Sequence, residues 1–195
     1  MNPVRLAIFA SGSGSNAEEI IRYFKNHENI DVSLLLSNNP DAHALKRAEG
    51  HGITSRIFDR KIYRDSTLIL DWLDEARITH IVLAGFLWLV PTYILDRFPG
   101  RIINIHPALL PKYGGKGMYG MKVHEAVKSA GDTISGITIH LVDAHYDEGK
   151  VIFQATCPIT EADGPEEIAA KIHKLEHQHF PPTIEKWIVN DSAVK

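Results

Sequence analysis

The 195-residue sequence contains a single cysteine, Cys157, which excludes an intramolecular disulfide. Because Cys157 lies in an apolar run, 151–159, we expect a buried, inert thiol in a protein adapted to a reducing cytoplasm. An excess of one charge is also missing, since 21 basic residues stand against 24 acidic ones, for a formal net charge of −3. Without a basic run, the sequence predicts no nucleic-acid partner and no membrane-surface partner.

Long apolar runs and targeting segments are missing as well. No stretch approaches the roughly 20 apolar residues of a membrane-spanning helix, and a strand pattern starts at Val4 without a leader before it. We therefore expect a cytoplasmic globular protein with one α/β domain, because a chain of this length buries a substantial core. The sequence shows no internal repeat and no low-complexity segment.

The eleven histidines do not form a recognised metal motif. His173, His177 and His179 give an i, i+4 pair plus one more histidine on a late helical segment. However, the first of them is not followed by the glutamate of the metalloprotease motif, and a cysteine cluster is missing. We therefore predict that the protein binds no metal.

Apolar strand-like segments alternate with helical patterns up to about residue 130, which predicts a Rossmann-like, mostly parallel sheet with helices on both faces. The expected strands are 4–10, 31–36, 53–58, 80–84 and 102–106, and the expected helices are 17–25, 42–51, 66–76, 91–98 and 121–130. Two alternating segments, 134–142 and 151–159, predict a late antiparallel strand pair. The last element is a long helix from Pro165 to about Val189, which Pro181 and Pro182 must break or kink.

The turn after the first strand, 11–16, reads Ser-Gly-Ser-Gly-Ser-Asn and leads into a helix. Glycines let the backbone approach an anion, and the helix N-terminus offers free N–H groups and a favourable dipole. The loose dinucleotide fingerprint also fits, but the second strand ends in Ser37-Asn38-Asn39-Pro40 without the acid that holds a ribose. We therefore predict a cradle for one phosphate group and disfavour a nicotinamide-dependent dehydrogenase; a plain tight turn is the alternative.

The segment Ile102–Gly117 contains the strongest chemical signal. Asn104 and His106 lie two residues apart on a strand and therefore point to the same face, at the strand exit where α/β enzymes keep their sites. An amide N–H suits a developing oxyanion, and an imidazole exchanges a proton near neutral pH. We predict a functional pair here, at the edge where it meets the turn after the first strand and the exit segment 85–91.

Two further loops have more than one interpretation. The segment 85–91 is strongly apolar, so it either covers the core or forms the wall of a pocket for a flat aromatic ligand. The acidic segment 143–149 is either a solvated loop or the source of an aspartate that reaches His106. In the second case the aspartate favours the imidazolium and raises the pKa of His106.

The run Asn-Ile-His-Pro-x-Leu-Leu-Pro at 104–111 resembles the signature of the formyltransferases that use 10-formyltetrahydrofolate. Essentially the whole chain is similar to the glycinamide ribonucleotide formyltransferase family of purine synthesis. The resemblance implies one formyltransferase domain over 1–195, with a phosphate-binding half at about 1–100 and a folate and catalytic half at about 101–195. It also implies transfer of a formyl group from 10-formyltetrahydrofolate to the amine of glycinamide ribonucleotide, without a metal.

The resemblance further implies a set of site residues. These are catalytic Asn104, His106 and Asp147; phosphate-binding Gly14, Ser15 and Asn16; substrate-binding Glu176; and folate-binding Arg64, Leu87, Trp88, Leu89, Val90, Asp143, Ala144, His145 and Tyr146. In the implied mechanism Asp147 keeps His106 protonated, and His106 stabilises the oxyanion and protonates the leaving folate nitrogen. The chain departs from the family at Trp88, where many members carry a basic residue, and in the longer glycine-rich segment 112–121.

Rival functions remain at this stage. A formyltetrahydrofolate hydrolase or a methionyl-tRNA formyltransferase uses the same domain, but we expect an additional domain in each and a basic surface in the second. A non-catalytic nucleotide-binding module would use only the cradle at 11–16 and would leave Asn104 and His106 without a purpose. The sequence allows either a monomer or a homodimer.

Overall fold

The computed structural model describes residues 3–64 and 66–193. The chain divides into two compact units, Met1–Ile103 and Asn104–Lys195, hereafter unit 1 and unit 2. The boundary falls inside strand β5, Ile102–His106. The sequence predicted the boundary between the two halves three residues earlier, between residues 100 and 101. The assignment of phosphate binding to the first half and of folate binding and catalysis to the second stays a prediction.

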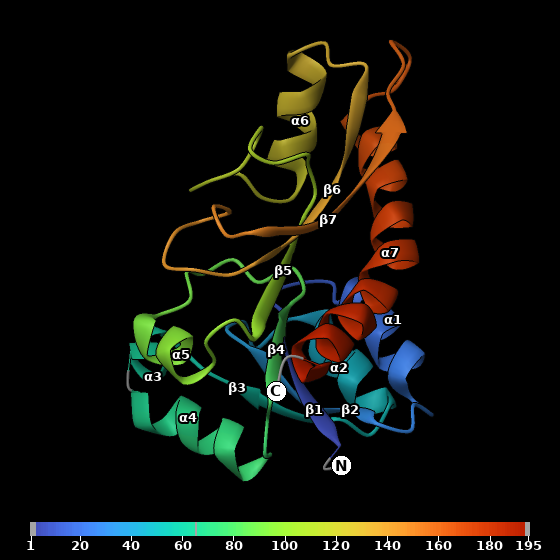
Figure 1. Cartoon of the computed structure of the whole chain (residues 1–195). Helices are drawn as coiled ribbons and strands as arrows, with labels where there is room; N and C mark the ends of the chain where they lie inside the picture. The colour runs from blue at the N-terminus through green and yellow to red at the C-terminus, as the bar shows by residue number, and fades with distance from the viewer. Residues whose placement is uncertain (1–2, 65, 194–195) are drawn as a thin grey trace. The chain divides into compact units, whose positions relative to one another are not determined.

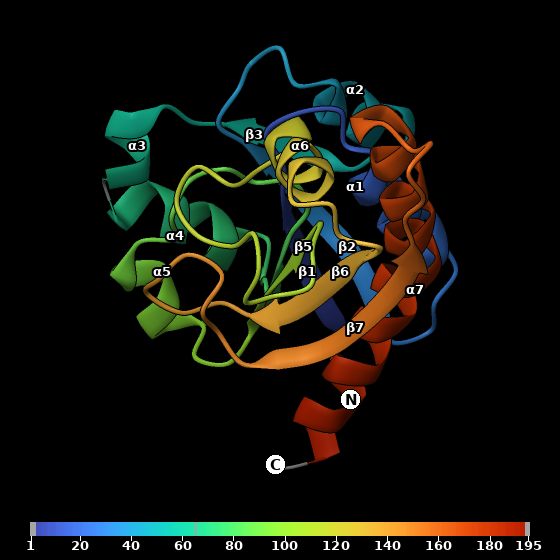
Figure 2. The same cartoon turned by 90° about the horizontal axis from the view of Figure 1, so that it is seen from above.

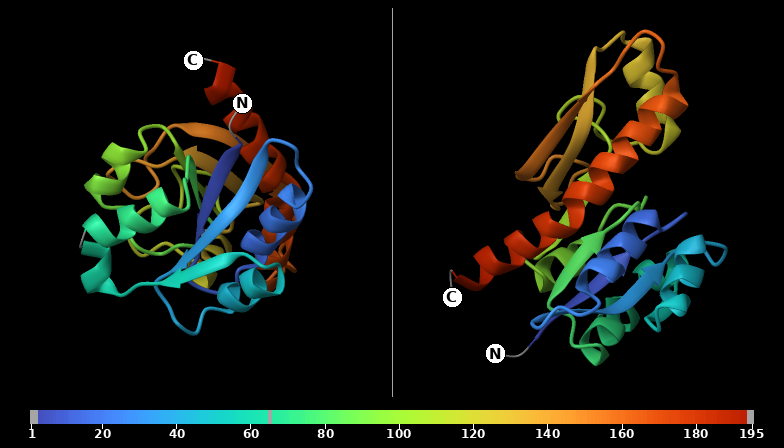
Figure 3. Two further views of the ribbon diagram at one scale, coloured as in Figure 1. Left: turned by 90° about the horizontal axis from the view of Figure 1, so that it is seen from below. Right: turned by 90° about the vertical axis from the view of Figure 1, so that its right-hand side faces the viewer.

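Unit 1 is built from alternating strands and helices (Figure 1). Its elements are β1 (Val4–Phe9), α1 (Ser15–Phe24), β2 (Ile30–Ser37), α2 (His43–Gly50), β3 (Thr54–Ile57), α3 (Arg60–Arg64), α4 (Ser66–Glu75), β4 (His80–Leu83), α5 (Thr92–Arg97) and the start of β5. Strand β1 pairs in parallel with β2 and β4, and β2 pairs in parallel with β3, in the order β3-β2-β1-β4-β5. Figure 2 and the left view of Figure 3 show α1 and α2 on one face of these strands and α4 and α5 on the other. The predicted parallel sheet with helices on both faces is confirmed.

Helix α1 shows why this segment folds as it does. Its buried side chains, Ala17, Ile20, Ile21 and Phe24, recur at the spacing of one helix face, while the opposite face carries charge. Strand β1 is buried on both faces from Leu6 to Phe9, as expected for an interior strand of a parallel sheet. This packing fixes the turn between the two elements.

Unit 2 contains the end of β5, then α6 (Met121–Ser129), β6 (Ile134–Leu141), β7 (Val151–Pro158) and α7 (Pro165–Ala193). Strands β6 and β7 pair antiparallel, with Ile137 opposite Ala155, and the order is β5-β6-β7. The right view of Figure 3 shows α6 and α7 on the same side of the β6–β7 ribbon. The predicted late antiparallel pair is confirmed.

Two features of the helices differ from the predictions. Helix α3 was not predicted, because five residues are too few for a periodic pattern; it starts where Asp59 Oδ1 accepts the N–H of Ile62 at 2.8 Å. Pro181 and Pro182 were predicted to break or kink the last helix; a break is wrong, since α7 runs through both prolines, and a kink stays a prediction. The buried neighbours Phe180 and Ile184 explain the difference, since packing supplies most helix stability in proteins and outweighs two missing N–H donors.

Candidate active site

Asn104 and His106 lie at the end of β5, as the alternation predicted. Ile103 and Ile105 are buried, Asn104 is half-buried and His106 is only 3% exposed. His106 Nε2 lies 2.7 Å from the carbonyl oxygen of Tyr113. A carbonyl can only accept, so Nε2 carries a proton and donates it there.

The other ring nitrogen of His106 faces a carboxylate. Nδ1 lies 3.5 Å from Asp147 Oδ2, with side chains that are 4% and 11% exposed. Burial lowers the pKa of His106, and the charge of Asp147 and the Tyr113 carbonyl raise it only in part, so the pKa is below its ordinary value. The expectation that Asp147 keeps His106 protonated is therefore wrong for the free protein: Asp147 acts in the expected direction, but desolvation is the larger effect. At neutral pH the imidazole is uncharged, with the Nδ1 lone pair towards Asp147.

Asp147 is itself held in place by a backbone donor. Burial raises the pKa of Asp147, but the neighbouring His140 ring, the positive charge that His106 carries when protonated and the N–H of Gly115 together lower it further, so the carboxylate is ionised. Gly115 donates to Oδ2 at 2.9 Å. Asp147 and Tyr113 both adopt left-handed backbone, with φ of 59° and 57°, which is uncommon outside glycine. The two groups that contact the His106 ring thus both come from strained positions, a feature often found at functional sites.

His140, on β6, completes this cluster and was missed from the sequence. Its Nδ1 donates to the carbonyl of Leu141 at 2.8 Å, which leaves Nε2 to accept the amide N–H of Asn104 at 3.1 Å. The same Nε2 lies 3.6 Å from Asp147 Oδ1. His140 therefore orients Asn104 and leaves the second Asn104 N–H for another acceptor. The only signal in the sequence was a histidine within a strand of alternating β-branched residues.

A second buried group on β6 holds the loop that follows β5. The hydroxyl of Thr138 donates to the carbonyl of Ala108 at 2.7 Å and accepts the N–H of Leu110 at 2.9 Å. Gln154 from β7 also donates to it at 2.8 Å, and Thr138 is fully buried. These three bonds fix the chain directly after His106, and the sequence analysis did not identify either residue.

The glycine-rich segment 112–120 follows. Lys112 is paired with both carboxylate oxygens of Asp132 at 3.0 and 2.9 Å, and the hydroxyl of Tyr113 donates to the same carboxylate at 2.8 Å. These bonds hold the start of the segment, where the Tyr113 carbonyl contacts His106. The ammonium of Lys112 is therefore engaged within unit 2.

Glu176 lies in a second polar group of unit 2. It is 5% exposed, and His173 Nδ1 lies 2.9 Å from its Oε2. The hydrogen bond to Glu176 raises the pKa of His173, whereas burial lowers the pKa of His124, which is 3% exposed on α6. The charge of Glu176 acts on both His106 and His124, so this group lies within electrostatic reach of the first.

The predicted phosphate cradle lies in unit 1. Gly14 is the N-cap of α1 with φ of 71°, and a Cβ there would lie 2.5 Å from Ala44 Cα. Only glycine fits both the left-handed backbone and this close approach. Ser15 and Asn16 begin the helix and are half-buried, and Arg47 Nε donates to the carbonyl of Ser13 at 2.9 Å. Since Gly14 has no side chain to cap the helix, the first N–H groups suit an anion.

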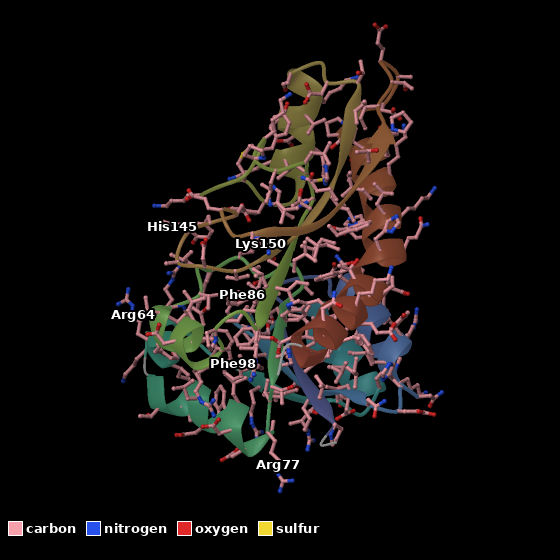
Figure 4. All side chains as sticks on the ribbon, viewed as in Figure 1. Arg64, Arg77, Phe86, Phe98, His145 and Lys150 are labelled. Atoms are coloured by element: carbon pink, nitrogen blue, oxygen red, sulfur yellow. The ribbon has the colours of Figure 1, made fainter. Side chains whose placement is uncertain are left out.

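Of the predicted folate residues of unit 1, Trp88 belongs to an aromatic cluster with Phe58, Tyr63 and Phe86. Leu87 and Leu89 are 44% and 39% exposed, Trp88 is half-buried and Val90 is buried. Phe86 and Val90 therefore cover the core, while Leu87 and Leu89 face outward. That the segment 85–91 forms the wall of a pocket for an aromatic ligand stays a prediction. Arg64, at the end of α3, is exposed and points away from the ribbon (Figure 4).

Arg60 was missed from the sequence. Its guanidinium lies over the Trp88 ring, 4.5 Å from the centroid, in a cation–π arrangement. In unit 2 the remaining predicted folate residues, Asp143 to Tyr146, form a turn in which Asp143 Oδ1 accepts the N–H of His145 at 2.9 Å. The structure therefore brings the catalytic trio together within unit 2 and the cradle together within unit 1; the meeting of the two sets stays a prediction.

Among residues 3–64 and 66–193, no group of three histidine, cysteine, aspartate or glutamate side chains is arranged to hold a metal ion. In the same part of the chain no helix is long and apolar enough to cross a membrane.

Comparisons with known proteins agree with this geometry. A family described as "Formyl transferase" matches residues 4–184. The chain is 38% identical to phosphoribosylglycinamide formyltransferase of Bacillus subtilis (strain 168), over 94% of this chain and 94% of that protein. It is also 38% identical to the chloroplastic phosphoribosylglycinamide formyltransferase of Vigna unguiculata, over 93% of this chain. The chain spans only 60% of the length of that plant protein.

The fold agrees as well. The crystal structure of phosphoribosylglycinamide formyltransferase from Bacillus halodurans matches with a TM-score of 0.85 and 37% identity, over 93% of this chain and 94% of that chain. The sequence matches, the fold match and the run at 104–111 all support the same family, and the chain belongs to the formyl transferase family.

Proposed function

We propose that the protein transfers the formyl group of 10-formyltetrahydrofolate to the amine of glycinamide ribonucleotide, giving formylglycinamide ribonucleotide and tetrahydrofolate. The observation that carries the proposal is the cluster of Asn104, His106 and Asp147 in unit 2, with His106 Nδ1 3.5 Å from the Asp147 carboxylate. The relatives named phosphoribosylglycinamide formyltransferase support the same reaction. The step belongs to de novo purine biosynthesis, and no resident cofactor is needed beyond the folate co-substrate.

The amine attacks the formyl carbon, and negative charge develops on the formyl oxygen. Asn104 uses one amide N–H on His140, so its second N–H is available to donate to this oxyanion. Because His140 fixes the amide, little reorganisation is required at the moment of reaction.

The proton then moves through His106. The neutral ring holds its Nε2 proton on Tyr113, so Nδ1 accepts the proton of the attacking amine, directly or through water. The resulting imidazolium is stabilised by Asp147. The same proton passes from Nδ1 to the folate nitrogen as the bond between that nitrogen and the formyl carbon breaks, which returns His106 to its neutral state.

Substrate binding is assigned to the residues that the sequence predicts. Backbone N–H groups at Gly14, Ser15 and Asn16 hold the phosphate of the ribonucleotide, and Glu176 contacts its remainder. The folate is held by Arg64 and Leu87–Val90 from unit 1 and by Asp143–Tyr146 from unit 2. Arg60 belongs to this set, since its charge over Trp88 replaces the basic residue that many family members carry at that position.

The partners are therefore small molecules, and the protein acts in the cytoplasm as a monomer or homodimer. An assay that follows loss of the formyl group from 10-formyltetrahydrofolate tests the proposal. It is run with glycinamide ribonucleotide, with water alone, and with the His106→Ala variant. His179→Ala is the matched control, because His179 packs against Phe153 with ring centroids 5.1 Å apart, outside the trio.

The proposal expects turnover that requires the ribonucleotide, disappears in His106→Ala and persists in His179→Ala. Formyl release without an acceptor would instead identify a formyltetrahydrofolate hydrolase. No release in either arm, together with binding of the ribonucleotide phosphate, would leave a nucleotide-binding module.

A further inference from the structure

The ring of His106 in unit 2 faces two competing acceptors with one proton. Nε2 lies 2.7 Å from the carbonyl oxygen of Tyr113, whereas Nδ1 lies 3.5 Å from the carboxylate of Asp147. A neutral imidazole carries a single proton, and the hydrogen bond made by one nitrogen decides the state of the other. If the carbonyl moved away, the carboxylate would draw the proton to Nδ1, and this nitrogen could no longer accept a proton from the attacking amine. The position of the Tyr113 carbonyl therefore decides whether the ring can act as the base of the proposed reaction.

The carbonyl belongs to a segment, Tyr113–Gly115, that contacts both members of the pair. The N–H of Gly115 donates to Asp147 Oδ2 at 2.9 Å, and a Cβ on Gly114 would lie 3.3 Å from Asp147 Cβ. Tyr113 has left-handed backbone with a φ of 57°, which a residue other than glycine keeps only where its surroundings impose it. A group outside the segment must therefore hold Tyr113 in this conformation.

Asp132, in the connection between α6 and β6, is such a group. Its Oδ2 accepts the hydroxyl of Tyr113 at 2.8 Å, and its two oxygens accept the ammonium of Lys112 at 3.0 and 2.9 Å. The hydroxyl bond to an ionised carboxylate is charge-assisted, whereas Lys112 is 65% exposed and its ion pair adds little. The bond between Asp132 and the hydroxyl is therefore the main constraint on the residue whose carbonyl faces His106.

We propose that Asp132 is a positioning residue that holds Tyr113 in place, and thereby keeps the proton of neutral His106 on Nε2 and the lone pair of Nδ1 free for the reaction. It acts through Tyr113 rather than by contact with the substrates. The kinetic consequence rests on the proposed function. The location of the proton on His106, in contrast, is a property of the substrate-free protein.

Nitrogen-15 NMR of the His106 ring tests the inference without substrate. At about pH 8 the ring is neutral, because its pKa lies below the ordinary histidine value. A protonated and an unprotonated ring nitrogen resonate far apart, so the parent protein should give two well-separated signals, with the proton on Nε2. Asp132→Ala removes the acceptor of the Tyr113 hydroxyl, and its two signals should move towards each other as the proton exchanges to Nδ1.

Two further variants identify the bond responsible. Tyr113→Phe removes the hydroxyl alone and should change the His106 signals in the same direction as Asp132→Ala does. Asp132→Asn keeps an oxygen that accepts the hydroxyl, so it should retain the signals of the parent protein.

Asp163→Ala is the matched control for stability. Asp163, directly before α7, also binds a lysine and a hydroxyl, because its Oδ2 accepts Lys171 Nζ at 2.6 Å and the hydroxyl of Thr160 at 2.9 Å. Asp163→Ala should therefore melt at a lower temperature than the parent protein but leave the His106 signals and kcat unchanged.

The formyl-transfer assay gives a second readout. Asp132→Ala and Tyr113→Phe should lower kcat about 10-fold, as for the loss of about one hydrogen bond, and leave KM for both substrates within about twofold of the parent value. A merely structural role would instead lower the amount of folded protein without moving the ring signals of the folded fraction.

Each result decides between the alternatives. Unchanged His106 signals in both Asp132→Ala and Tyr113→Phe would overturn the inference, as would an equal change in Asp163→Ala. If Asp132→Ala does not fold, Tyr113→Phe decides in its place, because it keeps the aromatic ring. If the parent protein transfers no formyl group to the ribonucleotide, the proposed function fails, and the NMR result still decides the role of Asp132.

Discussion

Asp147→Asn tests the proton relay with little change of shape. The asparagine is isosteric with aspartate, and its Oδ1 still accepts the N–H of Gly115 that lies 2.9 Å from Oδ2 in the parent protein. The substitution therefore leaves the loop in place and removes one negative charge, 3.5 Å from His106 Nδ1.

The expected loss follows from this distance. Two unit charges 3.5 Å apart interact with about 5 kcal/mol at an effective dielectric constant of about 20, which suits a pair this little exposed. His140 and Gly115 share the carboxylate, so we assign about 3 kcal/mol to the imidazolium that forms during the reaction. That corresponds to a decrease of about 10²-fold in kcat, within the range for acid–base assistance.

The pH dependence gives an independent readout. Asp147 raises the pKa of His106 against the larger effect of burial, so its removal lowers that pKa further. Because the relay starts from neutral His106, the acid limb of kcat/KM should move to lower pH, and NMR titration of the His106 ring should show the same shift. Turnover within about threefold of the parent protein, or an acid limb that does not move, would refute the assignment of Asp147 to the relay.

Three further predictions concern the framework of the site. Thr138→Val should lower the free energy of unfolding by about 3 kcal/mol in urea titrations, since it leaves the N–H of Leu110 and the carbonyl of Ala108 without their partner. Thr138→Ser should keep most of the stability, and equal stability of the two variants would contradict this. Gly14→Ala should weaken binding of glycinamide ribonucleotide at least 10-fold in calorimetric titrations, because Gly14 has a φ of 71° and the new Cβ would contact Ala44. Gly50→Ala is the control and should bind as the parent protein does, because no atom lies within 4 Å of its new Cβ. Asp163→Asn should destabilise the protein at pH 7, because Lys171 and Thr160 lower the pKa of Asp163 to about 2. The contribution of the ionised Asp163 to the free energy of unfolding is complete above the ordinary aspartate range and is lost as the pH falls through about 2. Urea titrations at pH 7 and pH 2 should therefore differ between parent and variant only at the higher pH, and a difference that persists at pH 2 would exclude the ion pair as its source.

The order of elements was largely predictable because local pattern determines it. Apolar runs such as β1 and the helical spacing in α1 identify their type directly, and every predicted strand is present within a residue or two of its expected bounds. Helix α3 and the continuity of α7 through Pro181 were not predictable. The first is too short for a period, and the second depends on burial of neighbours such as Phe180.

The shared face of Asn104 and His106 at a strand exit was predictable from the sequence, because the period of a strand is two residues. The glycine turn before α1 was predictable too, since few other residues adopt left-handed backbone. The contact of His140 with Asn104, from a strand 36 positions away, and the nitrogen of His124 that stays unpaired among the described residues depend on long-range packing. Tertiary structure also decided the direction of the pKa of His106, because desolvation depends on everything packed around the ring, whereas the sequence shows only the charge of its partner.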